Sequence, residues 1–191
     1  MGSSSEILRS ALAGARETLD LVADLEADLG RAAQLIVKCL TSEHKLLVCG
    51  NGGSAADAAD FSTEFACRFM DDRRPYPALN LAQGGSLLTA TGNDYGFAEI
   101  FARQVAAFGQ RDDLLIAIST SGGSVNIRRA LEEGQARQLK TIALLGRDGG
   151  ACKGIADIDL IVPAKATARI QEAHKFMLHV LCEICETQLP K

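Results

Sequence analysis

The sequence lacks the features that mark several protein classes. No apolar run approaches the roughly 18 residues of a membrane-spanning helix, and no signal-peptide pattern precedes the first helical segment. The net charge is −4, which gives no basic surface for nucleic acid. The pairs Arg73–Arg74 and Arg128–Arg129 are expected to face solvent. We therefore predict a protein with neither a membrane nor a nucleic acid as its partner.

The spacing of the cysteines does not indicate a disulfide-bonded protein either. The six cysteines, at positions 39, 49, 67, 152, 182 and 185, lie within or beside apolar segments, as small hydrophobic residues do in a reducing compartment. Cys182-x-x-Cys185 is the one metal-like or redox-like spacing, and no second pair accompanies it. Packing in the core is the favoured interpretation, and a cytoplasmic location is expected.

The chain has little proline, with four residues, and shows no linker, repeat or low-complexity stretch. A single domain over residues 1–191 is therefore expected. Residues 5–42 have a helical apolar period, with breaks favoured near Gly14 and Gly30. We predict two N-terminal helices there, which form an apolar arm that packs on the domain or on another subunit.

After residue 42, short apolar runs alternate with helical segments. The predicted strands are Leu46–Cys49, Ala78–Leu81, Leu114–Ile118, Thr141–Leu145 and Ile158–Val162, and the predicted helices are 54–70, 97–108, 124–138 and 167–188. Most runs are almost continuously apolar, as in strands buried on both faces. The fold class is α/β: a three-layer αβα sandwich with a doubly wound, five-stranded parallel sheet. Ligands of such sheets bind beyond the carboxyl ends of the strands, which selects loops 50–54, 82–94, 119–124 and 146–150.

The first loop, Gly50-Asn51-Gly52-Gly53-Ser54, has the glycines that let a ligand approach the backbone. Ser54 is the expected N-cap of the helix that follows. The loop has neither the G-x-G-x-x-G fingerprint nor the Gly-Lys-Ser/Thr of a Walker loop, so no nucleotide cofactor is expected. An anion cradle and a plain tight turn remain open for it.

The loop at 119–124 carries four hydroxyls, those of Ser119, Thr120, Ser121 and Ser124. With two glycines and a helix start, it can hold a phosphate monoester by hydroxyl and amide hydrogen bonds. A turn with an N-cap needs one serine rather than four hydroxyls, which favours the phosphate site.

Four motifs in order carry a specific resemblance. They are Leu46-Leu-Val-Cys-Gly-Asn-Gly-Gly-Ser54, Gly92-Asn-Asp-Tyr-Gly-Phe97, Ile118-Ser-Thr-Ser-Gly122 and Arg169-Ile-Gln-Glu-x-His174. The chain resembles the sugar isomerase (SIS) family over essentially its whole length and, within that family, the phosphoheptose isomerases. The resemblance implies isomerisation of sedoheptulose 7-phosphate to D-glycero-D-manno-heptose 7-phosphate, as the first step of ADP- or GDP-heptose biosynthesis. It also implies a homotetramer with active sites where subunits meet.

The resemblance also implies roles for individual residues. Ser119, Thr120, Ser121 and Ser124 would hold the phosphate; Asn51, Gly52, Gly53, Ser54, Asn93 and Asp94 would line the sugar; Arg68 and Gln171 would also belong to the substrate site. Glu64 matches the family's base and His179 its second acid/base, which suits an enediol proton transfer. The alternatives are a surface carboxylate for Glu64 and a packed helix histidine for His179. A non-catalytic phosphosugar-binding regulator of the same fold is a second hypothesis.

A metal site is implied as well, because many members of the family hold zinc among a histidine, the glutamate, a glutamine and the C-terminal histidine. The corresponding residues here are Asp60, Glu64, Gln171 and His179. Asp60 replaces the histidine, which gives a harder ligand set that suits manganese or magnesium better. Alternatively Asp60 faces solvent or caps a helix, and metal binding is lost. Gln171 and His179 lie about 12 Å apart on a regular helix, so a common site needs an irregular helix start or two subunits.

Two further positions affect the substrate site. Ala168 stands where relatives often carry an aspartate that can touch the sugar, so an isomerase of another phosphosugar remains an alternative. His174 is either a second polar residue of the site or a plain histidine on a helix face.

Overall fold

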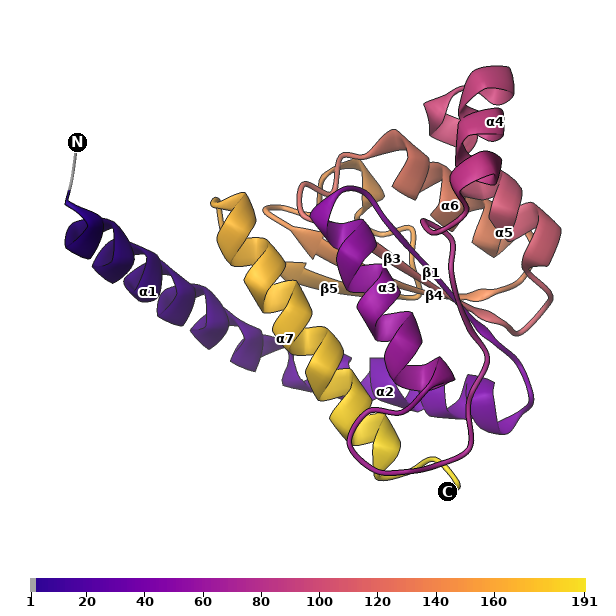
Figure 1. Cartoon of the computed structure of the whole chain (residues 1–191), viewed down its shortest axis with the longest axis horizontal. Coiled ribbons are helices and arrows are strands. Elements are labelled where there is room, and N and C mark those ends of the chain that lie inside the picture. Colours follow the sequence, from indigo (N-terminus) through magenta and orange to yellow (C-terminus); the bar gives the residue numbers. More distant parts are fainter. Residues whose placement is uncertain (1–2) are drawn as a thin grey trace.

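The structure is a computed structural model that describes residues 3–191 (Figure 1). Its elements, in chain order, are α1 (Ser4–Asp20), η1 (Leu21–Leu25), α2 (Glu26–Thr41), β1 (Leu46–Gly50), α3 (Gly53–Ala66), β2 (Ala78–Asn80), α4 (Gly85–Tyr95), η2 (Phe97–Glu99), α5 (Ala102–Phe108), β3 (Leu114–Ser119), α6 (Val125–Ala136), β4 (Lys140–Gly146), η3 (Gly150–Cys152), β5 (Ile158–Val162) and α7 (Thr167–Glu186). Here η marks a 3₁₀ helix.

The strands form one parallel sheet in the order β2-β1-β3-β4-β5, with Leu47 opposite Leu115 and Leu115 opposite Thr141. This confirms the predicted five-stranded parallel sheet. Every residue of β1 and β3 is buried, as the unbroken apolar runs indicated. Successive side chains point to opposite faces, so Leu46 and Val48 enter one core and Leu47 and Cys49 enter the other.

Helices cover both faces of the sheet and complete the predicted three layers. On one face, α2, α3 and α7 pack over the larger core, which includes Ile36, Phe61 and Met177. On the other face, α5 and α6 contribute Val105 and Leu131 to the second core. Figure 1 shows α3 and α7 side by side over the strands. The two helices therefore offer a shared seam for side chains from distant parts of the sequence.

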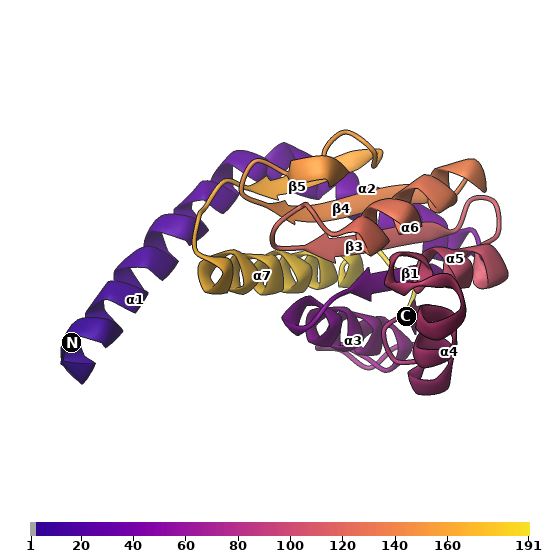
Figure 2. The same cartoon turned by 90° about the horizontal axis from the view of Figure 1, so that it is seen from above.

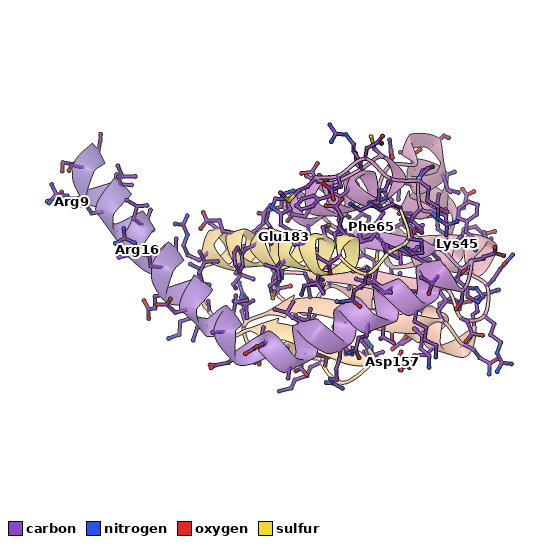
Figure 3. The ribbon with its side chains drawn as sticks, turned by 90° about the horizontal axis from the view of Figure 1, so that it is seen from below. Arg9, Arg16, Lys45, Phe65, Asp157 and Glu183 are labelled. Carbon is purple, nitrogen blue, oxygen red and sulfur yellow. The ribbon has the colours of Figure 1, made fainter. Side chains whose placement is uncertain are left out.

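The N-terminal arm is two helices joined by η1, so two helices are confirmed but the break lies at Leu21–Leu25. Gly14 and Gly30 both lie inside helices, α1 and α2. Figure 2 shows α1 projecting away from the rest of the molecule. Along it, Ile7 and Leu8 are 64% and 60% exposed, and Figure 3 shows that no other element lies beside the turns around Arg9.

Two other expectations about the elements were wrong. The predicted loop 82–94 contains α4, a helix in which only Thr91 is buried. Its exposure explains why no apolar period marked it in the sequence. The predicted helix 97–108 is divided into η2 and α5, with Ile100 and Phe101 buried between them.

The cysteine prediction is confirmed, whereas one basic pair was misjudged. Cys182 and Cys185 are free and buried in the core on α7. The Arg73 side chain is only 3% exposed, and its Nε lies 3.7 Å from a Glu186 carboxylate oxygen. The expectation that Arg73 faces solvent is therefore wrong, because the Glu186 carboxylate of α7, the Phe65 ring of α3 and the Tyr76 ring of its own loop enclose it. Within residues 3–191, no helix has the length and apolar character needed to cross a membrane.

Candidate active site

Two of the four loops that the sequence selected, 50–54 (the glycine loop) and 119–124 (the serine loop), meet at one point of the sheet. β1 and β3 are neighbours, and the chain continues outward in opposite directions from them, which leaves a crevice beyond their carboxyl ends. A hollow of about 50 Å³ lies there, lined by Asn51, Ser54, Ile118, Ser119, Thr120, Ser121 and Ser124. The structure thus brings six of the predicted substrate residues together.

The glycine loop reaches this hollow through an unusual backbone conformation. Gly52 has φ +55° and precedes the first residue of α3, Gly53. Ser54 lies inside the first turn, buried, and makes no capping bond. The prediction that Ser54 is the N-cap was therefore wrong, because the left-handed Gly52 starts the helix two residues earlier. Its hydroxyl instead faces the hollow.

The serine loop directs its hydroxyls toward one another. The Ser119 Oγ lies 3.2 Å from the Ser124 Oγ and 3.5 Å from the Ser121 Oγ. Ser119 also accepts a hydrogen bond from the Gly122 amide at 3.1 Å. Ser124 precedes α6 but makes no side-chain cap to it, so its hydroxyl is turned into the loop. This geometry is a cluster of hydrogen-bond donors without a fixed positive charge, which suits a phosphate monoester at a helix start.

One residue that sequence reasoning missed joins the two loops. Asn126, buried on α6, exchanges two amide hydrogen bonds with Asn51, both 2.8 Å long. Because each amide both donates to and accepts from the other, the Asn51 side chain has a fixed orientation. Nothing in the pattern around Asn126 marked it, since its partner lies 75 residues earlier in the chain.

The loop 146–150 packs against the backbone of the serine loop. Gly122 has φ +63°, and a side chain there would meet the backbone of Gly149 and Gly150. The Gly122 carbonyl accepts a hydrogen bond from the Cys152 amide at 2.9 Å. The serine loop is therefore held by backbone contacts that require glycine at position 122.

The two predicted acid/base residues lie on the seam between α3 and α7, farther from the sheet's carboxyl edge. Glu64 is half-buried near the end of α3. The Glu64 carbonyl accepts a hydrogen bond from the Arg73 guanidinium at 2.5 Å, and the Arg73 Nε lies 3.7 Å from the Glu186 carboxylate of α7. Glu64 therefore lies near the C-terminal end of α7. The His179 ring lies 5.9 Å from that of Phe69, centroid to centroid. Both candidate side chains therefore belong to one end of the seam.

A single chain does not bring all the predicted residues to the hollow. Ser54 and Glu64 are ten residues apart on α3, about 15 Å along its axis. Arg68 lies beyond the end of α3, exposed, and donates to the Met70 carbonyl at 3.0 Å. Asn93 and Asp94 occupy the last turn of α4, where the Asn93 amide donates to the Asp94 carboxylate at 2.7 Å.

The predicted metal ligands do not converge either. α7 is regular from Thr167, so Gln171 and His179 remain about 12 Å apart, with Gln171 against Gly53. Asp60 is ion-paired with Lys175 of α7. In the part of the chain from residue 3 to 191, no group of three or more His, Cys, Asp or Glu side chains is arranged to hold a metal. Within one chain, the four predicted ligands are therefore not placed around a common point.

His174 belongs to the core rather than to the site. It is fully buried, and one ring nitrogen, Nε2, lies 3.1 Å from the Leu145 carbonyl oxygen. Burial lowers its pKa to about 4, against a smaller opposing effect of that carbonyl. The interpretation as a second polar residue of the site is therefore wrong, and the histidine joins α7 to β4.

Comparison with known proteins adds independent findings. The sequence model of the SIS domain matches residues 12–146. A phosphoheptose isomerase from Coxiella burnetii is 48% identical over 162 residues, which are 83% of this chain and 81% of that protein.

Solved structures agree over almost the full length. A phosphoheptose isomerase from Francisella tularensis superposes with a TM-score of 0.94 at 39% identity, covering 97% of this chain and 100% of the other. One from Neisseria gonorrhoeae gives a TM-score of 0.90 at 38% identity with the same coverage.

Proposed function

The chain belongs to the SIS domain family and to its phosphoheptose isomerases, and we propose that it converts sedoheptulose 7-phosphate to D-glycero-D-manno-heptose 7-phosphate. It is an isomerase by this membership. The observation that carries the choice of substrate class is the hollow at the β1/β3 crevice, where hydroxyls of both loops converge. A phosphate monoester is the ligand that such donors fit best.

Glu64 is the proposed base and His179 the second acid/base. In this mechanism the Glu64 carboxylate takes the proton from C1 of the ketose and returns it to C2. His179 moves a proton between the oxygens on C1 and C2, so an enediol forms and collapses without net oxidation. Both residues lie on the seam between α3 and α7, and this supports the assignment. Two helices packed side by side can present the Glu64 carboxylate and the His179 ring to the same bound sugar.

The active site is proposed to form between subunits of a homotetramer. Within one chain, Glu64 is about 15 Å along α3 from Ser54, which lines the hollow. The Arg68 guanidinium donates to the Met70 carbonyl of its own loop. The exposed apolar residues of α1, with Ile7 at 64% and Leu12 at 48%, offer a surface that a second copy could cover. A neighbouring subunit can then supply the residues that one chain leaves apart.

The direct test is incubation of the purified protein with sedoheptulose 7-phosphate in deuterated water. The expected result is aldose formation with deuterium at C1 or C2. Glu64→Gln removes the base and keeps the size of the side chain, so turnover should fall at least about 100-fold while phosphosugar binding persists. Glu26→Gln, at an exposed glutamate of α2, is the matched control and should retain full activity. A Glu64→Gln variant that turns over normally contradicts the base assignment.

One observation leaves room for a different phosphosugar as the substrate. Ala168, in the first turn of α7, offers no polar contact to a sugar hydroxyl. An isomerase of another phosphosugar is therefore the alternative, and a panel of ketose phosphates in the same deuterium assay separates the two. Faster turnover of a different phosphosugar would replace the proposed substrate.

The proposed setting is the cytoplasm, where the product would enter ADP- or GDP-heptose biosynthesis. All six cysteines are free, as expected in a reducing compartment.

A further inference from the structure

A cluster of charged side chains crosses the seam between α3 and α7, at the position where the family resemblance implies a metal. Asp57 and Asp60 stand one turn apart on α3, and Lys175 comes from α7. The Lys175 ammonium is ion-paired with the Asp60 carboxylate and lies 3.6 Å from an oxygen of Asp57. The cluster therefore holds its own cation between two carboxylates.

The cation matters most for Asp57, because Asp57 is the buried member of the cluster, whereas the Asp60 side chain is 61% exposed. Asp57 is 5% exposed, and its Oδ2 has no hydrogen-bond partner among the described residues. Burial raises the pKa of Asp57, and the charge of Lys175 is the largest effect that opposes the rise. An uncompensated buried carboxylate is costly, so Lys175 stabilises the ionised form of Asp57 as well as pairing with Asp60.

The same ammonium opposes a metal ion. A divalent cation bound to Asp60 would have to share the carboxylate with the ammonium and would be repelled by its charge. Gln171, the other ligand expected on this part of α7, is packed against Gly53 instead. In this arrangement the Asp60 carboxylate is already paired with the ammonium, and the Gln171 amide lies beside Gly53.

We infer that Lys175 replaces the metal ion of this family: its ammonium supplies the fixed positive charge beside Asp60, and isomerisation by this chain needs no divalent metal. The inference deepens the proposed function and rests on it for the activity measurements. Metal content, in contrast, tests it without any reference to turnover.

The first experiment measures metal in protein purified without chelator, by inductively coupled plasma mass spectrometry, and follows turnover before and after chelator treatment. The expected result is far less than one divalent ion per chain and unchanged turnover after chelation. Stoichiometric metal, or turnover that is lost on chelation and restored by zinc, overturns the inference. Absence of turnover under every condition, with and without metal, instead contradicts the proposed function.

The second experiment removes or keeps the positive charge at position 175. Lys175→Met should lower turnover at least tenfold, Lys175→Arg should retain most of it, and Lys38→Met, at an exposed lysine of α2, should have no effect. Thermal unfolding of each variant checks the fold. Equal loss in the methionine and arginine variants, or no loss in either, would show that the charge at this position is not required.

The double variant Asp60→His, Lys175→Met removes the ammonium and restores a softer ligand. It should bind zinc in a calorimetric titration under conditions where the wild-type chain binds none. If it takes up no more zinc than the wild type, Lys175 is not what keeps the metal out, and the inference fails.

Discussion

Replacement of Gly122 by alanine tests whether the backbone of the serine loop positions the hydroxyls of the proposed phosphate site. Gly122 has φ +63°, and an added β-carbon would stand 2.9 Å from the Gly150 nitrogen and closer still to the Gly149 carbonyl. Since both obstacles are backbone atoms, no side-chain rotation relieves them. Either the serine loop or the loop 146–150 must move.

The expected loss of stability follows from three contributions. The left-handed conformation costs an alanine about 1–2 kcal/mol, and overpacking adds at least about 1 kcal/mol. Displacement of the loop weakens the bond from the Cys152 amide to the Gly122 carbonyl, 2.9 Å long, which is worth about 1 kcal/mol. A total near 3 kcal/mol corresponds to a fall in melting temperature of roughly 6–12 °C.

Gly30→Ala provides the matched control, because it is the same chemical change in the interior of α2 with no atom within 4 Å of the added carbon. It should stabilise the helix by about 1 kcal/mol and raise the melting temperature by roughly 2–4 °C. Thermal unfolding measures both variants. Steady-state kinetics of Gly122→Ala should show a raised KM, because the displaced hydroxyls bind phosphate less well.

The outcome that refutes this reasoning is a Gly122→Ala protein with unchanged melting temperature and KM. The serine loop would then tolerate a side chain, and its backbone would not be what places the hydroxyls.

Two further predictions concern buried charged or titratable groups. Arg73→Met breaks a buried ion pair with Glu186 and should lower the free energy of unfolding, measured by chemical denaturation, by about 3 kcal/mol. Arg74→Met, at an exposed position, is the control and should lower it by less than about 1 kcal/mol. Equal losses in the two variants would contradict the burial argument. The pKa of His174 is about 4 in the folded chain against 6.5 for a free histidine, so its contribution to stability is complete above pH 6.5 and is lost as the pH falls toward 4. Unfolding free energies between pH 7 and 4 should fall by about 3 kcal/mol through this group, and His174→Gln should remove that part of the slope; an unchanged slope would mean that His174 is not responsible.

The sequence determined the sheet and selected the serine loop as a candidate phosphate site. A parallel strand covered by helices on both faces must be apolar at nearly every residue, so the central strands β1, β3 and β4 were visible as runs, Leu114–Ile118 most clearly. The carboxyl ends of such strands lie at one edge, so the loops after Cys49 and Ile118 could be expected to meet. The four hydroxyls of 119–124 predicted a phosphate ligand, and the structure shows that the Ser119, Ser121 and Ser124 hydroxyls lie together.

Local conformation was less well determined. α4 carries few buried residues, so nothing in its sequence marked it as a helix, and Asn93 and Asp94 were assigned to a loop. Ser54 is a good capping residue, but Gly52 adopts the left-handed backbone that starts the helix earlier. In both places a weak local preference gave way to the geometry of the surrounding chain.

Contacts between distant segments were decided by the tertiary structure alone. Asn51 meets Asn126, Arg73 meets Glu186, and Asp60 meets Lys175, 115 residues later. The family resemblance implied a metal ion at Asp60 and Glu64, and their spacing permits one, because residues four apart share a helix face. What lies opposite that face depends on the packing of α3 against α7, and there the fold places a lysine.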